Sequence, residues 1–196
     1  MKILVALASY LLGSVPTGYL LSRWSGTGDV RKFGSGSTGA TNVLRVKGWK
    51  VALPVVAFDI LKGFLPVFLA MRWFDDPVFS AFCGLAAVVG HCFPFSIGFR
   101  GGKGVATSLG AFAAIAWAPC LASAGLFLIV VGLTRYVSLG SILGALAFPL
   151  IVLAGGGSAA VAAIALAIAA LVVVRHRGNI RRLLHGAERR LGERAT

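Results

Sequence analysis

The chain has 196 residues, of which 58% are hydrophobic and 13% are charged, and its mean hydropathy is +0.89. A water-soluble domain of this size would need a far more polar surface, so the composition excludes a soluble globular protein and predicts a membrane protein. The formal net charge of +13 lies mostly between apolar runs, which indicates the positive-inside bias of membrane proteins rather than a nucleic-acid-binding domain.

Apolar segments define the expected spans. Three segments are each about twenty residues long, which is enough for a helix to cross a bilayer: 3–21, 51–71 and 78–97. We interpret the first as an uncleaved span, because it lacks a convincing cleavage site. Two longer runs follow, and a single helix of 34 residues would measure about 50 Å, too long for the bilayer. Breaks at Pro119 and at the glycines 155–157 therefore predict two hairpins, with helices over 105–118, 120–133, 141–154 and 159–174.

Charge predicts the orientation. The segment 22–50 carries six Lys or Arg and one acid, and the tail from Arg175 carries seven Arg, so both should be cytoplasmic. The N-terminus is then outside, and the number of spans is odd. We expect an all-α, polytopic helical membrane protein with seven transmembrane helices, five being the alternative. A single integral membrane domain, 1–196, accounts for the chain.

Buried polar residues have simple interpretations. The three cysteines are odd in number and lie in apolar stretches, so they predict neither disulfides nor a metal site. Asp59 and Lys62, three residues apart in the second span, should pair with each other. His91 is expected to be a hydrogen-bonded core residue.

The first polar loop runs from Gly34 to Arg45 and matches G-x-G-x-x-G. No strand precedes the match, so a dinucleotide site is excluded by context. Glycine turns can still direct N–H groups at an anion, with hydroxyls and an arginine as further donors, although a flexible linker is equally consistent. The candidate binding residues here are Gly34, Ser35, Gly36, Ser37, Thr38, Gly39, Thr41, Asn42 and Arg45.

The second loop, Gly98-Phe-Arg-Gly-Gly-Lys-Gly104, leads directly into an apolar helix. It resembles a phosphate-binding loop but is not a Walker A motif, because Lys103 is followed by glycine. Glycine N–H groups, a helix N-terminus and an ammonium group would together bind an anion. A basic connector with a tight turn is the alternative. The candidates are Gly101, Gly102, Lys103 and Gly104.

The third segment begins at Arg175. Ile180, Leu183, Leu184, Ala187 and Leu191 recur at helical spacing, which predicts a helix on the membrane surface. An anchor helix does not explain His176 and Asn179, which share one face directed toward the loops. In the loop between the last two hairpins, Ser141 is expected to cap a helix N-terminus.

Three anion-binding segments on one membrane face indicate a phosphorylated ligand. A transporter would place its cations near the bilayer midplane. A CDP-alcohol phosphotransferase would need several acids for its metal, and no His-x4-Asp dyad of the other acyltransferase type is present. A membrane enzyme is favoured.

The three motifs together resemble those of the PlsY family, the bacterial acyl-phosphate-dependent glycerol-3-phosphate acyltransferases. The resemblance runs the whole length of the chain and departs mildly at Ser96, Arg100 and Gly178. It rests on Gly34-Ser-Gly-Ser-Thr-Gly-Ala-Thr-Asn-x-x-Arg45, Gly90-His-x-Phe-Pro94, Gly101-Gly-Lys-Gly-Val-Ala-Thr107, and Arg175-His-x-x-Asn-Ile-x-Arg-Leu183 with Gly186 and Glu188.

The resemblance implies transfer of a fatty acyl group from acyl phosphate to the 1-hydroxyl of sn-glycerol 3-phosphate, giving lysophosphatidic acid and phosphate, at the cytoplasmic face of the bacterial inner membrane. It implies no cofactor, metal, nucleic acid or obligate protein partner. By motif position the catalytic residues are Ser35, Lys103, His176 and Asn179, and the remaining candidates, including Ser141, bind substrate. Either His176 or a donor phosphate oxygen takes the proton.

Overall fold

The computed structural model describes residues 1–26 and 28–193, and within these ranges all regular structure is helical. Two short 3₁₀ helices, η1 (Val30–Lys32) and η2 (Phe95–Ile97), lie in the loops. The α-helices are α1 (Lys2–Gly13), α2 (Thr17–Trp24), α3 (Ala40–Lys47), α4 (Trp49–Phe74), α5 (Pro77–Cys92), α6 (Val105–Ile115), α7 (Trp117–Thr134), α8 (Val137–Ala154), α9 (Ala159–Arg175) and α10 (Arg177–Leu184).

Five helical segments are long and apolar enough to cross a bilayer. The pair α9 and α10, bent by 60°, is a sixth if it counts as one span. The helix α6 is apolar but has only 11 residues. The all-helical membrane architecture predicted from the sequence is therefore confirmed, while the count of seven remains a prediction. The five segments are Lys2–Trp24, Trp49–Phe74, Pro77–Ile97, Trp117–Thr134 and Val137–Ala154.

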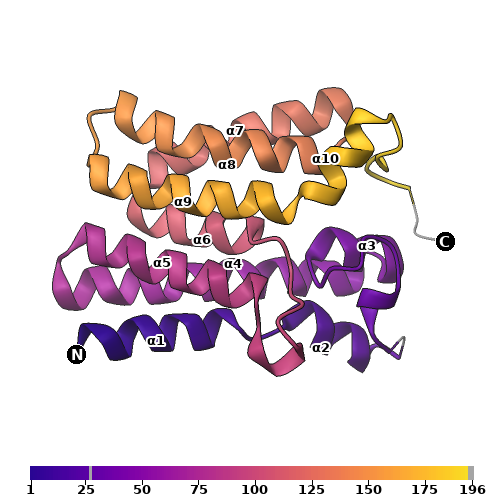
Figure 1. Ribbon diagram of the computed structural model, residues 1–196, viewed down its shortest axis with the longest axis horizontal. Helices are drawn as coiled ribbons and strands as arrows, with labels where there is room; N and C mark the ends of the chain where they lie inside the picture. Colours follow the sequence, from indigo (N-terminus) through magenta and orange to yellow (C-terminus); the bar gives the residue numbers. More distant parts are fainter. Residues whose placement is uncertain (27, 194–196) are drawn as a thin grey trace.

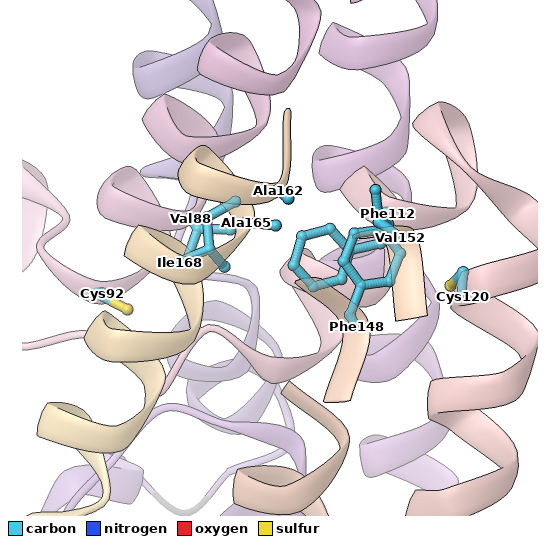
Figure 2. Close-up of a cluster of buried hydrophobic side chains, with 9 residues drawn as sticks. All are labelled: Val88, Cys92, Phe112, Cys120, Phe148, Val152, Ala162, Ala165 and Ile168. Carbon is cyan, nitrogen blue, oxygen red and sulfur yellow. The ribbon is translucent and has the colours of Figure 1, made fainter. Parts of the chain in front are cut away.

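The helices pack in two layers with α6 between them. In Figure 1, α1, α4 and α5 lie on one side, and α7, α8 and α9 lie on the other. Glycines allow the close crossing of α4 and α6: a Cβ on Gly63 would collide with the Thr107 carbonyl, and one on Gly110 would collide with the Ile60 carbonyl. The apolar core then joins the layers, with the Phe112 and Phe148 rings stacked 3.7 Å apart (Figure 2).

The first predicted span is broken. Pro16 has no N–H to donate, and α1 gives way to α2 there, where the Val15 carbonyl accepts from the Thr17 N–H at 3.0 Å in place of a helical hydrogen bond. Lys62 on α4 donates to this carbonyl at 2.9 Å and also pairs with Asp59 at 2.7 Å. The predicted pairing of Asp59 with Lys62 is confirmed, and Lys62 also binds the backbone at the break between α1 and α2. The three cysteines are buried and free, as expected of small core residues.

The two predicted hairpins form, with two boundaries corrected: α8 begins at Val137 rather than at residue 141, and the break in the first hairpin is displaced. The break between α8 and α9 falls at the predicted glycines, and the Ser158 hydroxyl caps α9. The break predicted at Pro119 lies instead at Ala116, because a proline fits in the first turn of α7, where its missing N–H is not needed.

All three motif segments lie at the same end of the bundle (Figure 1). Arg31 donates to the Ile97 carbonyl at 2.8 Å, and Arg45 donates to the Arg189 carbonyl at 3.0 Å. The tail is also held to the turn between α7 and α8, because Arg135 and Leu191 exchange two hydrogen bonds of 2.7 and 2.9 Å. The three segments therefore share one end of the fold, while the expectation that this end lies at the cytoplasmic face remains a prediction.

The predicted surface helix is shorter than expected. It ends at Leu184, and Gly186 turns the chain with a φ of 66°. Ala187 and Leu191 therefore lie beyond the helix, and the turn brings Glu188 into the interior, where it is 6% exposed.

Candidate active site

A cavity of about 370 Å³ lies where the three motif segments meet. Its wall is polar on the loop side and apolar toward the helices. Most of the residues proposed from the sequence border it: Ser35, Ser37, Gly39, Thr41, Asn42, Arg45, Lys103, Gly104, Ser141, His176 and Asn179. The other candidates do not border it: Gly34, Gly36, Thr38, Gly101 and Gly102.

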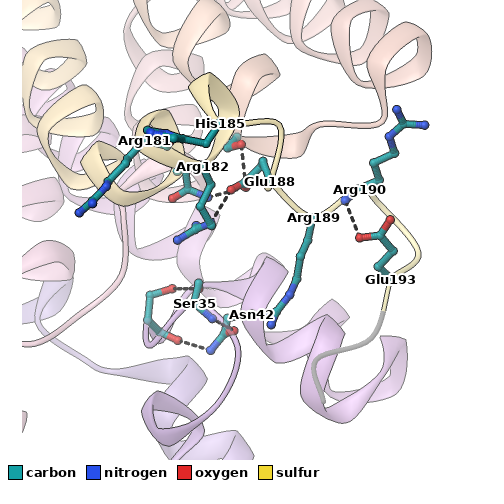
Figure 3. A network of polar contacts seen from close by, with 12 residues as sticks. Ser35, Asn42, Arg181, Arg182, His185, Glu188, Arg189, Arg190 and Glu193 are labelled. Carbon is teal, nitrogen blue, oxygen red and sulfur yellow. Dashed lines mark hydrogen bonds and ion pairs between the residues drawn. The ribbon is translucent and has the colours of Figure 1, made fainter.

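The first loop is shaped by the buried Asn42. Its side-chain oxygen accepts from the Ser35 N–H at 2.8 Å, and its amide nitrogen lies 2.9 Å from the Ser37 carbonyl and 3.2 Å from those of Val30 and Phe33. Figure 3 shows Asn42 beside Ser35. Because these contacts occupy the amide, Asn42 organises the loop, which corrects the expectation that it binds substrate directly. The Ser35 and Ser37 hydroxyls lie 3.1 Å apart at the cavity wall.

Gly34 and Gly36 serve the same loop. Both have positive φ, 60° and 69°, a conformation that glycine adopts without strain. The Gly36 N–H donates to the Phe33 carbonyl at 3.1 Å. The glycines of this segment therefore make its turns, and Gly39 marks the N-terminus of α3, which faces the cavity.

The second loop uses its glycines for packing. The N–H groups of Gly101 and Gly102 donate to the carbonyls of Cys92 and His91 at 3.2 and 3.1 Å. A Cβ on Gly102 would collide with the His91 ring. The expectation that these two N–H groups bind an anion is therefore wrong.

Arg175 fixes the other face of this loop. Its guanidinium donates to the Gly101 and Gly102 carbonyls at 3.1 and 3.0 Å. The first hydrogen bond of α6 runs from the Ser108 N–H to the Gly104 carbonyl, so the N–H groups of Val105 and Ala106 precede the helical ladder at the cavity wall. The helix N-terminus, rather than the glycine pair, supplies backbone donors.

Lys103 reaches from this loop to the third segment. Its ammonium donates to the Asn179 side-chain oxygen at 2.6 Å. The pKa of Lys103 is lowered to about 8, chiefly by burial and also by the charges of Arg182, Arg45 and Arg175, while Glu188 opposes them. The two carboxylates that line the cavity, Asp59 and Glu188, are paired with Lys62 and Arg182, so Lys103 and Arg45 are suited to bind an anion.

Glu188 is a site residue that the sequence analysis did not place there. It accepts from the Asn179 amide at 2.6 Å and from Ser138 at 2.9 Å. It also accepts from Arg182 at 2.8 Å (Figure 3). Burial alone would raise the pKa of Glu188, but these hydrogen bonds outweigh it and lower the pKa. The sequence feature that could have indicated this role is the position of Glu188, an acid at the end of an arginine-rich motif.

His176 has a defined tautomer. Its Nδ1 lies 2.8 Å from the Val172 carbonyl, which only accepts hydrogen bonds, so Nδ1 carries the proton. Nε2 then keeps its lone pair, and the ring borders the cavity. This arrangement fits a proton acceptor.

Ser141 borders the cavity but does not cap a helix. The helix α8 begins at Val137, and the Ser141 hydroxyl donates to the Val137 carbonyl at 2.8 Å. Its expected capping role is therefore wrong, because the helix begins one turn earlier. Ser138, in that first turn, connects α8 to Glu188.

The remaining wall is apolar and continues between the helices. Residues of α4, α6, α7 and α8 form it: Val56, Ile60, Leu109, Phe112, Cys120, Ala124, Phe127 and Ala145. Such a wall accommodates a hydrocarbon chain. Among residues 1–26 and 28–193, no group of three or more His, Cys, Asp or Glu could hold a metal ion.

The helical membrane fold and a cavity with one cationic and one apolar side define an integral membrane enzyme that acts on an acyl chain and an anion. The family model described as glycerol-3-phosphate acyltransferase matches residues 3–186. The chain belongs to the glycerol-3-phosphate acyltransferase family and is a membrane acyltransferase.

Relatives and solved structures agree over nearly the whole chain. The glycerol-3-phosphate acyltransferase of Synechococcus sp. (strain CC9902) is 47% identical over 98% of this chain and 96% of its own. That of Geobacter sulfurreducens is 45% identical over 96% and 97%. Crystal structures of PlsY (YgiH), an integral membrane glycerol 3-phosphate acyltransferase, align with TM-scores of 0.94 for the glycerol 3-phosphate form and 0.90 for the lysophosphatidic acid form. They are 41% and 40% identical, each over 97% of this chain and over 96% and 95% of their own.

Proposed function

We propose that the chain transfers a fatty acyl group from acyl phosphate to the 1-hydroxyl of sn-glycerol 3-phosphate. The observation that carries this proposal is the cavity itself, in which Lys103 and Arg45 border a polar region that continues into an apolar wall. Solved relatives in glycerol 3-phosphate and lysophosphatidic acid forms support the acceptor and the product.

The site residues have distinct roles in this reaction. Arg45, Lys103 and the α6 N-terminus neutralise the phosphate groups, while the Ser35 and Ser37 hydroxyls donate hydrogen bonds at the cavity wall. The remaining members of the proposed binding set, Thr41, Gly39, Gly104 and Ser141, line the cavity and shape it around the glycerol backbone.

The chemistry needs one bond made and one broken. The 1-hydroxyl oxygen of glycerol 3-phosphate attacks the acyl carbonyl carbon, and the bond from that carbon to the phosphate oxygen breaks, releasing phosphate. The hydroxyl proton passes to His176 Nε2 or to a donor phosphate oxygen. Lys103 and the helix N-terminus stabilise the charge that develops as the tetrahedral intermediate forms. The reaction as written uses no cofactor or metal.

We further propose seven membrane crossings in a single domain, 1–196, of the bacterial inner membrane. The short α6 and the bent α9 would complete the five longer spans. The end of the bundle that bears the motifs also carries most of the arginines and lysines, which supports a cytoplasmic active site and an external N-terminus.

The choice of acyl donor provides a test of the proposal. Purified protein with glycerol 3-phosphate should form lysophosphatidic acid from acyl phosphate and not from acyl-CoA. A thioester offers no phosphate beside the reacting carbonyl, so the cations at the cavity could not position it. The Lys103→Ala variant, prepared in the same way, controls for contaminating enzymes. Robust turnover with acyl-CoA in the intact protein, absent from the variant, would contradict the proposal.

A further inference from the structure

Glu188 is buried beside the cavity, and the reaction as written does not use it. Glu188 is 6% exposed, and its carboxylate contacts two helices: Asn179 and Arg182 on α10 and Ser138 on α8 account for its hydrogen bonds. A carboxylate that is this well satisfied has its position and charge set by the fold.

The chain of contacts from Glu188 to Lys103 allows only one orientation of the Asn179 amide. An ionised carboxylate accepts hydrogen bonds and cannot donate, whereas an ammonium group donates and cannot accept. The Asn179 nitrogen must therefore face Glu188 at 2.6 Å, and its oxygen must face Lys103 at 2.6 Å. The amide consequently offers the Lys103 side an acceptor.

We propose that Glu188 is a positioning residue: its carboxylate fixes the side-chain amide of Asn179 so that the amide oxygen holds Lys103 at the cavity wall. This inference rests on the proposed function only in treating Lys103 as the cation that binds phosphate.

Charge adds a second effect through the same contacts. Lys103 faces Arg45 from α3, Arg175 and His176 at the end of α9, and Arg182 from α10. Burial and the three guanidinium groups disfavour the protonated ammonium, while Glu188 favours it. Glu188 thus keeps Lys103 both in place and charged near neutral pH, and its loss should show as a change in pH dependence.

The Glu188→Gln variant separates this role from a merely structural one. Glutamine keeps the size but loses the charge, and it can donate as well as accept, so the Asn179 amide is no longer held in one orientation. We expect the alkaline limit of glycerol 3-phosphate affinity to fall by about one pH unit, the lower end of the effect of a nearby opposite charge. Affinity at pH 8 should then be about fivefold weaker than in the unchanged protein.

The measurement is the thermal shift produced by glycerol 3-phosphate in detergent-solubilised protein between pH 6 and 9.5. It reports binding without turnover and does not depend on the acyl donor. The matched control is Glu193→Gln, because Glu193 is an exposed acid of the same tail whose carboxylate accepts from the Arg190 N–H. An unmoved alkaline limit in Glu188→Gln, or an equal movement in both variants, would overturn the inference.

Two further variants make every outcome informative. If Glu188→Gln does not yield folded protein, Glu188→Asp keeps the charge but withdraws the carboxylate by one methylene. Its alkaline limit should then stay in place while affinity falls severalfold, and unchanged affinity would overturn the inference. If Lys103→Ala binds glycerol 3-phosphate as the intact protein does, the proposed role of Lys103 fails, whatever happens at Glu188.

Discussion

Replacing Lys103 should be far more damaging than replacing Arg100, although the two lie in the same loop. Lys103 donates to Asn179 at 2.6 Å and borders the cavity, whereas Arg100 is exposed and is not among the lining residues. Of these two residues, only Lys103 is positioned to contact a phosphate group. The pair therefore distinguishes a specific contact from the general positive charge of the loop.

The expected size of the effect follows from the type of contact. A hydrogen bond to a charged group contributes about 1.5–3 kcal/mol, which corresponds to a tenfold to more than hundredfold loss of kcat/KM. The loss is larger if the contact strengthens in the transition state. Arg100→Ala should change kcat/KM by less than about fivefold, because a screened surface charge contributes about 0–1 kcal/mol.

The assay is lysophosphatidic acid formation from acyl phosphate at varied glycerol 3-phosphate concentration. Thermal unfolding of both variants supplies the control for folding. Burial disfavours the charged form of Lys103, as its lowered pKa indicates, so Lys103→Ala should unfold no earlier than the intact protein below pH 8. Equal losses of activity at the two positions would mean that both residues merely anchor the loop, and the reasoning would be refuted.

Three other outcomes are expected. Because the pKa of Lys103 is about 8, KM for glycerol 3-phosphate should rise as the pH increases above 8, up to tenfold per unit, and a KM that stays flat to pH 9.5 would contradict this. Activity should survive EDTA, since arginine, lysine and backbone donors meet the phosphate charge; loss on chelation with recovery on adding magnesium would disprove it. Asn42→Ala should lower stability by about 1–3 kcal/mol and reduce kcat/KM, while Lys47→Ala on the same helix, a half-buried residue whose ammonium makes one exposed hydrogen bond to the Ser25 carbonyl, should do neither; thermal unfolding and activity measure both.

The sequence predicted the architecture well because hydrophobic length and glycine breaks are local signals. The hairpins and the meeting of Gly34–Arg45 with Lys103 and Asn179 follow from run lengths and charge bias. The break at Ala116 was predicted at Pro119 instead, because a proline can either end a helix or lie in its first turn. Which of the two occurs depends on the surrounding chain.

Residue roles were harder to predict, because they depend on contacts between distant segments. Gly102 lies in a loop whose composition is typical of anion binding, yet its N–H donates to the His91 carbonyl. Asn42 looks like a ligand-binding amide but is occupied within its own loop. Glu188 reaches the cavity only through the turn at Gly186, which helical periodicity could not indicate.

The turn at Gly186 has a practical consequence for altering the protein. A stop codon placed directly after α10 would leave every helix intact and would resemble the harmless removal of a basic tail. It would nevertheless delete Glu188 and the two hydrogen bonds between Leu191 and Arg135, and it would release the amide of Asn179. Fusion partners and affinity tags therefore belong after residue 193, and an inactive truncation would identify a lost carboxylate rather than a lost membrane anchor.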